Sequence, residues 1–110
     1  MTSIVIRQDE KSLNVAIKGH CERDVCIAVS AITNTIAQFA EDFRDKNSGF
    51  RTNTLHVRRG NTQISVSADK AQTFKRFMQG ADALLLGFAL YADNFPGEII
   101  LDFQCRTFKK

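Results

Sequence analysis

The residue types best suited to chemistry gather in one short stretch, between Gly19 and Ser30. His20 stands where a strand pattern ends, and Cys26 follows six residues later, in the first turn of a predicted helix. With Asp24 as the N-cap of that helix, Cys26 takes the second helical position, beside unpaired backbone N–H groups and the positive end of the helix dipole. Such a position favours the thiolate, which is the nucleophilic form of cysteine. The stretch therefore predicts a reactive thiol.

A nearby imidazole would complete a nucleophilic pair, because it takes up the thiol proton and returns a proton to the leaving group. The chain between His20 and Cys26 can extend or fold back, so the spacing permits a contact without requiring one. Asp24 either caps the helix, orients His20, or does both. Ser30 lies one helical turn after Cys26, on a small polar face that it shares with Thr33. That face would leave room for a substrate backbone, and N–H groups at the helix start would hold the oxyanion.

The other cysteines and the second histidine have plainer interpretations. A cysteine on a helix is most often a small buried residue, and for Cys26 this alternative stands beside the nucleophile. Cys105 follows the apolar alternation of its strand and is expected in the core, whereas His56 is expected on a solvated face. Cys21 is either a second thiol for redox pairing with Cys26 or part of an ordinary loop. The chain has no Cys-x-x-Cys or His-x-x-x-His spacing, so neither a metal nor a cofactor is expected.

Hydrophobic periodicity predicts the elements that must position this stretch. Alternating residues indicate strands, and three- and four-residue steps indicate helices, in the order ββαββαβ. Strands are expected at 4–7, 13–18, 54–58, 64–68 and 99–105, and helices from Asp24 to Phe43 and, with Asp69 as N-cap, to Phe95. Because each strand has one apolar face, the fold class is α+β: a two-layer sandwich of a mostly antiparallel five-stranded sheet with two helices on one face. Gly80 and Gly87 indicate a close approach to the second helix by the first helix or by another subunit.

The composition favours a single domain, residues 1–110, in the cytoplasm. The chain has 110 residues and is 44% apolar, which is enough to bury a core without disulfides or metal. Its net charge of +3 comes from scattered basic residues, apart from Arg58-Arg59 and the tail, so direct nucleic-acid binding is not expected. No apolar run reaches the ~18–20 residues of a membrane span, and no secretion signal is recognisable. The odd number of cysteines, 3, fits a reduced compartment.

The stretch around Cys26 resembles the motif of the ribosomal-processing cysteine proteases. Members of that family carry Gly-His at a strand end, a loop, and then Asp-(Ile/Val)-Val-Cys-Ala-Ala-Val-Ser at the start of a helix. Gly19-His20 and the residues at 24–31, Asp-Val-Cys-Ile-Ala-Val-Ser-Ala, match this pattern. The chain length, the order of elements, the small residues of the second helix and the Phe95-Pro96 exit are also similar to the family.

The resemblance implies a cysteine endopeptidase that acts as a homodimer. Cys26 would be the nucleophile and His20 the base, with Gly19, Asp24 and Ser30 in supporting or substrate-binding positions. The substrate would be the short N-terminal extension of a ribosomal large-subunit protein or, for a phage-derived enzyme, a capsid or scaffold protein. The expected partners are therefore a protein substrate and a second copy of the chain, with no membrane and no direct nucleic acid.

The loop between the histidine and the cysteine is shorter here than in the family. Only residues 21–25 separate the two side chains, and none of them is a glycine. Loop closure commonly completes the site of a small hydrolase, so the short loop motivates a second hypothesis. In it the chain keeps the fold and acts as a non-catalytic, dimeric binding or assembly protein.

Overall fold

The computed structural model describes residues 1–20 and 22–105 of the chain. Five strands and two helices follow one another in the predicted order. Cys21 and positions 106–110 lie outside the described residues, so the alternatives for Cys21 stay predictions. The elements are β1 (Thr2–Gln8), β2 (Ser12–Gly19), α1 (Arg23–Lys46), β3 (Phe50–Arg58), β4 (Asn61–Ala68), α2 (Ala71–Asn94) and β5 (Ile99–Cys105).

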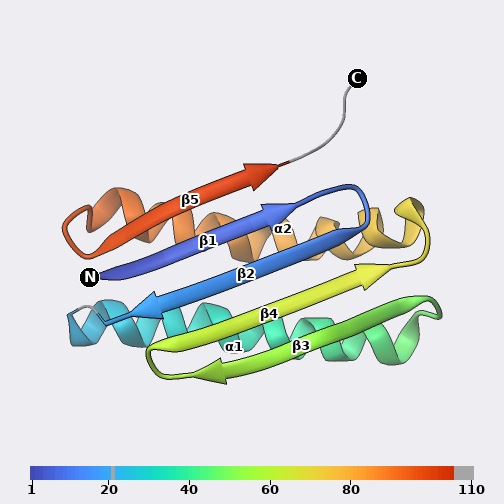
Figure 1. Cartoon of the computed structure of the whole chain (residues 1–110), viewed down its shortest axis with the longest axis horizontal. Coiled ribbons are helices and arrows are strands. Elements are labelled where there is room, and N and C mark those ends of the chain that lie inside the picture. The colour runs from blue at the N-terminus through green and yellow to red at the C-terminus, as the bar shows by residue number, and fades with distance from the viewer. Residues whose placement is uncertain (21, 106–110) are drawn as a thin grey trace.

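The strands form one sheet in the order β3-β4-β2-β1-β5. Neighbouring strands pair antiparallel except β1 and β5, which run parallel. Both helices lie side by side on one face of the sheet and run in opposite directions (Figure 1). The predicted two-layer α+β sandwich, with a mostly antiparallel sheet and two helices on one face, is confirmed.

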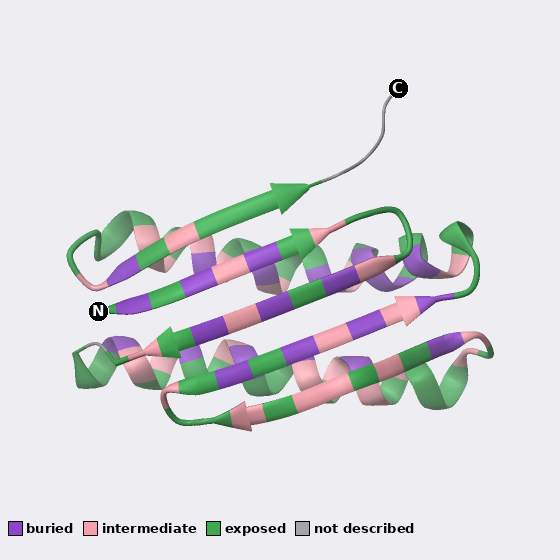
Figure 2. Cartoon of the chain, viewed as in Figure 1, coloured by how far each residue is buried: buried purple, intermediate pink, exposed green. Residues whose placement is uncertain are grey.

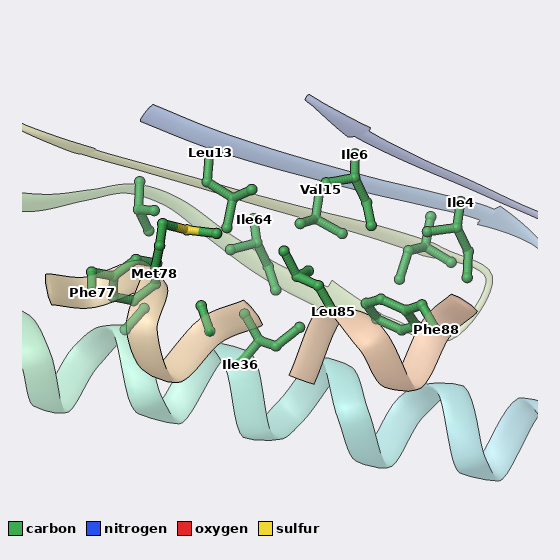
Figure 3. Packing of buried hydrophobic residues seen from close by; sticks show 14 of the residues in the cluster. Ile4, Ile6, Leu13, Val15, Ile36, Ile64, Phe77, Met78, Leu85 and Phe88 are labelled. Atoms are coloured by element: carbon green, nitrogen blue, oxygen red, sulfur yellow. The ribbon is translucent and has the colours of Figure 1, made fainter. Parts of the chain in front are cut away.

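Burial alternates along the strands and shows how the core forms (Figure 2). On β1, β2 and β4 every second side chain turns toward the helices and is buried, as the two-residue period of a strand requires. Figure 3 shows these side chains meeting those of the two helices. From α2 the buried residues recur at steps of one, three or four: Phe74, Phe77, Met78, Ala81, Leu85 and Phe88.

Phe77 lies at the centre of an aromatic cluster that joins both helices to β3. Its ring centroid lies between 4.7 and 6.1 Å from those of four other rings, which are Phe39, Phe43, Phe50 and Phe74. The helices approach closely beside it, because a Cβ on Gly80 would lie 2.5 Å from Cζ of Phe39 on α1. The neighbour that the glycines of α2 predicted is therefore the first helix.

The predicted cap of α2 is wrong. The helix begins at Ala71, and its N-cap is Lys70, whose side chain makes no cap hydrogen bond. The carboxylate of Asp69 instead forms a salt bridge with Arg51. The backbone N–H of Asp69 donates to the carbonyl of Gly49 (2.8 Å). A partner on β3 thus holds the side chain that local sequence assigned to the helix.

The end of β5 is also less buried than predicted. Ile99 is 3% exposed, but Phe103 on the same face is 53% exposed, and Cys105 is exposed rather than part of the core. β5 is an edge strand, and the helix layer covers only its beginning. Apolar alternation therefore identified the strand but not how far the helices reach along it.

The aromatic cluster predicts a large difference between two phenylalanine substitutions. Phe77→Ala should lower the free energy of unfolding by about 3–5 kcal/mol, because the side chain is fully buried among other rings. Phe103→Ala, the matched control on the exposed end of β5, should cost less than about 1 kcal/mol. Urea unfolding followed by circular dichroism measures both values. Equal losses would show that the core is not centred on Phe77.

Candidate active site

An open cavity of about 640 Å³ lies where the end of β2, the first turns of α1 and the β3–β4 turn meet. This volume falls within the range of roughly 300–1,000 Å³ that is typical of ligand pockets. Four of the predicted site residues line it: Gly19, His20, Cys26 and Ser30. The structure thus places His20, which directly follows β2, and Cys26 of α1 in the lining of one cavity.

His20 is positioned by the turn between β3 and β4. β2 and β4 pair antiparallel, with Lys18 opposite Asn61, so the strand end that carries His20 lies beside this turn. The backbone N–H of Gly19 donates to the carbonyl of Gly60 (3.1 Å). The His20 ring then packs directly on Gly60, where an added Cβ would lie 2.7 Å from both Cε1 and Nε2. The turn therefore acts as a platform for the imidazole.

The backbone around His20 is tied to two further parts of the chain. The amino group of Met1 donates a hydrogen bond to the carbonyl of His20. The backbone N–H of Glu22 donates to Oε1 of Glu98, in the loop between α2 and β5 (2.5 Å). With the bond between Gly19 and Gly60, these contacts hold the described ends of the short loop to the start of β1, to the β3–β4 turn and to the loop before β5.

The start of α1 differs from the prediction by two residues. The N-cap is Glu22, not Asp24, and its carboxylate accepts a hydrogen bond from the backbone N–H of Asp24 (3.1 Å). Cys26 is consequently the fourth helical residue, and its N–H donates to the carbonyl of Glu22 (2.9 Å). The half-buried side chain of Cys26 still lies in the first turn, near the positive end of the helix dipole. Its own N–H is used by the helix, so it is not one of the unpaired groups that were expected beside the thiol.

The other predicted residues have different surroundings. Ser30 is exposed and lines the cavity one turn after Cys26. Thr33 was expected on the same polar face, but it is 2% exposed and its hydroxyl donates to the carbonyl of Val29 (2.7 Å). Asp24 is exposed and is not among the residues that line the cavity, so its support of His20 stays a prediction.

Sequence reasoning missed the contribution of the β3–β4 turn to this cavity. Arg58, Arg59 and Gly60 all line it, together with Arg23 from the first turn of α1. The adjacent arginines and the turn glycine were visible in the sequence, but only the pairing of β2 with β4 places them beside His20. No acidic residue is among the described residues that line the cavity. The described lining of the cavity therefore carries three arginines and no carboxylate.

Neither a cluster of metal ligands nor a membrane-spanning helix occurs in the described part of the chain. Within residues 1–20 and 22–105, no three His, Cys, Asp or Glu side chains are grouped so that they could hold a metal ion. In the same residues, neither helix is both long and apolar enough to cross a membrane.

Solved structures with the same fold exist at low sequence identity. SMU.848 from Streptococcus mutans superposes with a TM-score of 0.70 over 96% of this chain and 96% of its own, at 19% identity. The ribosomal processing protease Prp from S. aureus, in complex with a substrate peptide, gives a TM-score of 0.60 over 94% of this chain and 100% of its own, at 14% identity. This chain has the Prp fold. A second Prp structure, with a covalently linked product peptide, gives a TM-score of 0.58 at 15% identity. No family model matches the chain, and no curated protein matches it in sequence.

Within this Prp fold, the contact between His20 and Gly60 predicts a specific effect of one methyl group. Gly60→Ala should displace the imidazole, because the new Cβ would overlap the ring. The nuclear magnetic resonance signals of the His20 ring should shift, while those of His56 on β3 should not.

Gly49→Ala is the matched control for the backbone. Gly49 has a φ of +83°, close to the +79° of Gly60, but the nearest atom to its Cβ is a side-chain oxygen of Asp69 at 3.4 Å. Both variants should lose about 1–2 kcal/mol of stability from the positive φ, but only Gly60→Ala should move His20. Unchanged His20 signals in Gly60→Ala would contradict the role of the turn.

Proposed function

We propose that the protein is a cysteine endopeptidase in which Cys26 is the nucleophile and His20 the general base. The observation that carries this proposal is that both residues line one open cavity, His20 directly after β2 and Cys26 in the first turn of α1. The shared fold adds support, because Prp from S. aureus has been solved with a substrate peptide and with a covalently linked product peptide.

The proposed reaction follows the usual course of a thiol protease. His20 takes the proton of the Cys26 thiol, and the sulfur attacks the carbonyl carbon of a peptide bond. The C–N bond breaks as His20 returns the proton to the leaving amine, which leaves a thioester on Cys26. Water then attacks the thioester with His20 as base, which releases the new carboxylate and restores the thiol. Each step needs only groups that line the cavity, together with water.

Stabilisation of the oxyanion needs a donor other than the N–H of Cys26, which already bonds to Glu22. Ser30 is the side chain best placed for this role on α1. It lies four residues after Cys26 on the same helix face, and side chains of a helix lean toward its N-terminus. We therefore assign Ser30 as the oxyanion donor, with Gly19 and Asp24 in supporting positions.

The substrate is proposed to be a peptide segment of another protein. The N-terminal extension of a ribosomal large-subunit protein and a phage capsid or scaffold protein are the two candidates that the resemblance predicts. A homodimer in the cytoplasm belongs to the same proposal.

The anchored loop favours a second candidate function. Its ends are held by Met1 and Glu98, and few residues separate His20 from Cys26, so little chain is free to close over a substrate. A protein that binds a partner on this fold without cleaving it would need no such closure.

Substitution of the two proposed catalytic residues distinguishes these functions. Cys26→Ala and His20→Ala should each lower peptide cleavage by at least about 1,000-fold, because each removes one member of a nucleophile–base pair. Mass spectrometry of a proteome-derived peptide library measures cleavage even though the substrate is unidentified.

Two variants outside the cavity serve as controls for the chemistry. Cys105→Ala removes an exposed thiol on β5, and His56→Ala removes an exposed imidazole on β3. Both should cleave as the wild type does. If the wild-type protein produces no new peptide termini, or if Cys26→Ala produces the same ones, the non-catalytic function is supported instead.

A further inference from the structure

We propose that the cavity selects peptides with acidic side chains close to the bond to be cleaved. This inference rests on the proposed function and adds a substrate class to it. Three arginines line the cavity, Arg23 on α1 and Arg58 and Arg59 at the β3–β4 turn, and no acidic residue is among its described lining. The three guanidinium groups would pair with carboxylates of a bound segment, in bidentate geometry where the approach allows it.

The arginines flank both members of the proposed catalytic pair. Arg23 precedes Cys26 by three residues and is therefore its neighbour on the surface of α1. Arg58 and Arg59 lead directly into Gly60, on which the His20 ring packs. An extended peptide with its scissile carbonyl at Cys26 would thus pass a cationic group on the helix side and another on the turn side.

None of these three arginines forms a salt bridge with another described residue. Within the described part of the chain, the salt bridges join Arg44 with Asp45 and Arg51 with Asp69, and none involves an arginine of the cavity. The carboxylates nearest to Arg23 along the chain are those of Glu22, which caps α1, and Asp24, which is outside the lining. A cleft lined by charges of one sign concentrates ligands of the opposite sign.

A peptide fits the lining better than a nucleic acid does. Apart from His20, no aromatic side chain is among the described residues that line the cavity. Single-stranded nucleic acids bind through stacking on aromatic side chains as well as through phosphate contacts. The apolar part of the lining consists of aliphatic residues such as Ile17, Val29 and Val57, which suit peptide side chains.

The test measures binding and needs no turnover. The Cys26→Ala protein is titrated into three hexapeptide pools with the same neutral fluorophore, identical except that two positions are fixed as Glu, Gln or Lys. Fluorescence anisotropy should give a dissociation constant at least about tenfold lower for the Glu pool than for the Gln pool, with the Lys pool weakest. The preference should fall as ionic strength rises.

Variants that each remove one positive charge show which arginines cause the preference for the Glu pool. Arg58→Gln, Arg59→Gln and Arg23→Gln, each added to Cys26→Ala, should each reduce the ratio between the Glu and Gln pools at least about threefold. Lys75→Gln, an exposed cation on α2 outside the cavity, removes the same charge and should leave the ratio unchanged. Circular dichroism confirms that each variant is folded.

Three results would overturn the proposal. These are equal affinities for the Glu and Gln pools, a ratio that Lys75→Gln lowers as much as the cavity variants do, and tighter, arginine-dependent binding of a single-stranded oligonucleotide. If the protein prefers the Glu pool but the wild type cleaves no peptide, the protease function is contradicted. The preference of the cavity for acidic peptides would still be supported.

Discussion

The pairing of β2 with β4 determines where chemistry can occur on this fold. It places Lys18 opposite Asn61, so the end of β2 and the β3–β4 turn lie side by side at one end of the sheet. A shift of one residue would turn the buried face of β2 toward solvent, so the hydrophobic core itself enforces this register. The imidazole of His20 then has the backbone of Gly60 beneath it, and α1 brings Cys26 to the same cavity. Core packing and the geometry of the site are thus consequences of one strand pairing.

Most of the fold could be predicted from the sequence because its periodic signals are strong. The buried stripe of α2 runs from Phe74 to Phe88, and buried residues recur at every second position along β1, β2 and β4. The predictions were wrong where pairing or burial depends on parts of the chain far away in the sequence. Asp69 has the residue type of an N-cap, but Arg51 on β3 binds its carboxylate. Cys105 continues an apolar alternation, but no helix reaches the end of β5 to bury it.

Only the part of the candidate site that lies within one short stretch of the sequence could be predicted. Gly19, His20, Cys26 and Ser30 lie in one stretch, and a strand end followed by a helix start brings them to one cavity. The arginines of the β3–β4 turn could not be assigned to the site, because their position depends on strand order, which no local pattern encodes. The exact start of α1 also depended on a distant contact, since Glu98 holds the backbone of the residue that caps the helix.

Activation of Cys26 by His20 is the step on which the proposed function depends. The most direct measurement is the rate at which iodoacetamide alkylates each cysteine at about pH 6, where an ordinary thiol is almost entirely protonated. Peptide-level mass spectrometry follows Cys26 and the exposed Cys105 in the same sample. We expect Cys26 to react at least about tenfold faster than Cys105, and His20→Ala to remove the difference. Equal rates in the wild type, or a fast Cys26 that ignores the loss of His20, would contradict this activation.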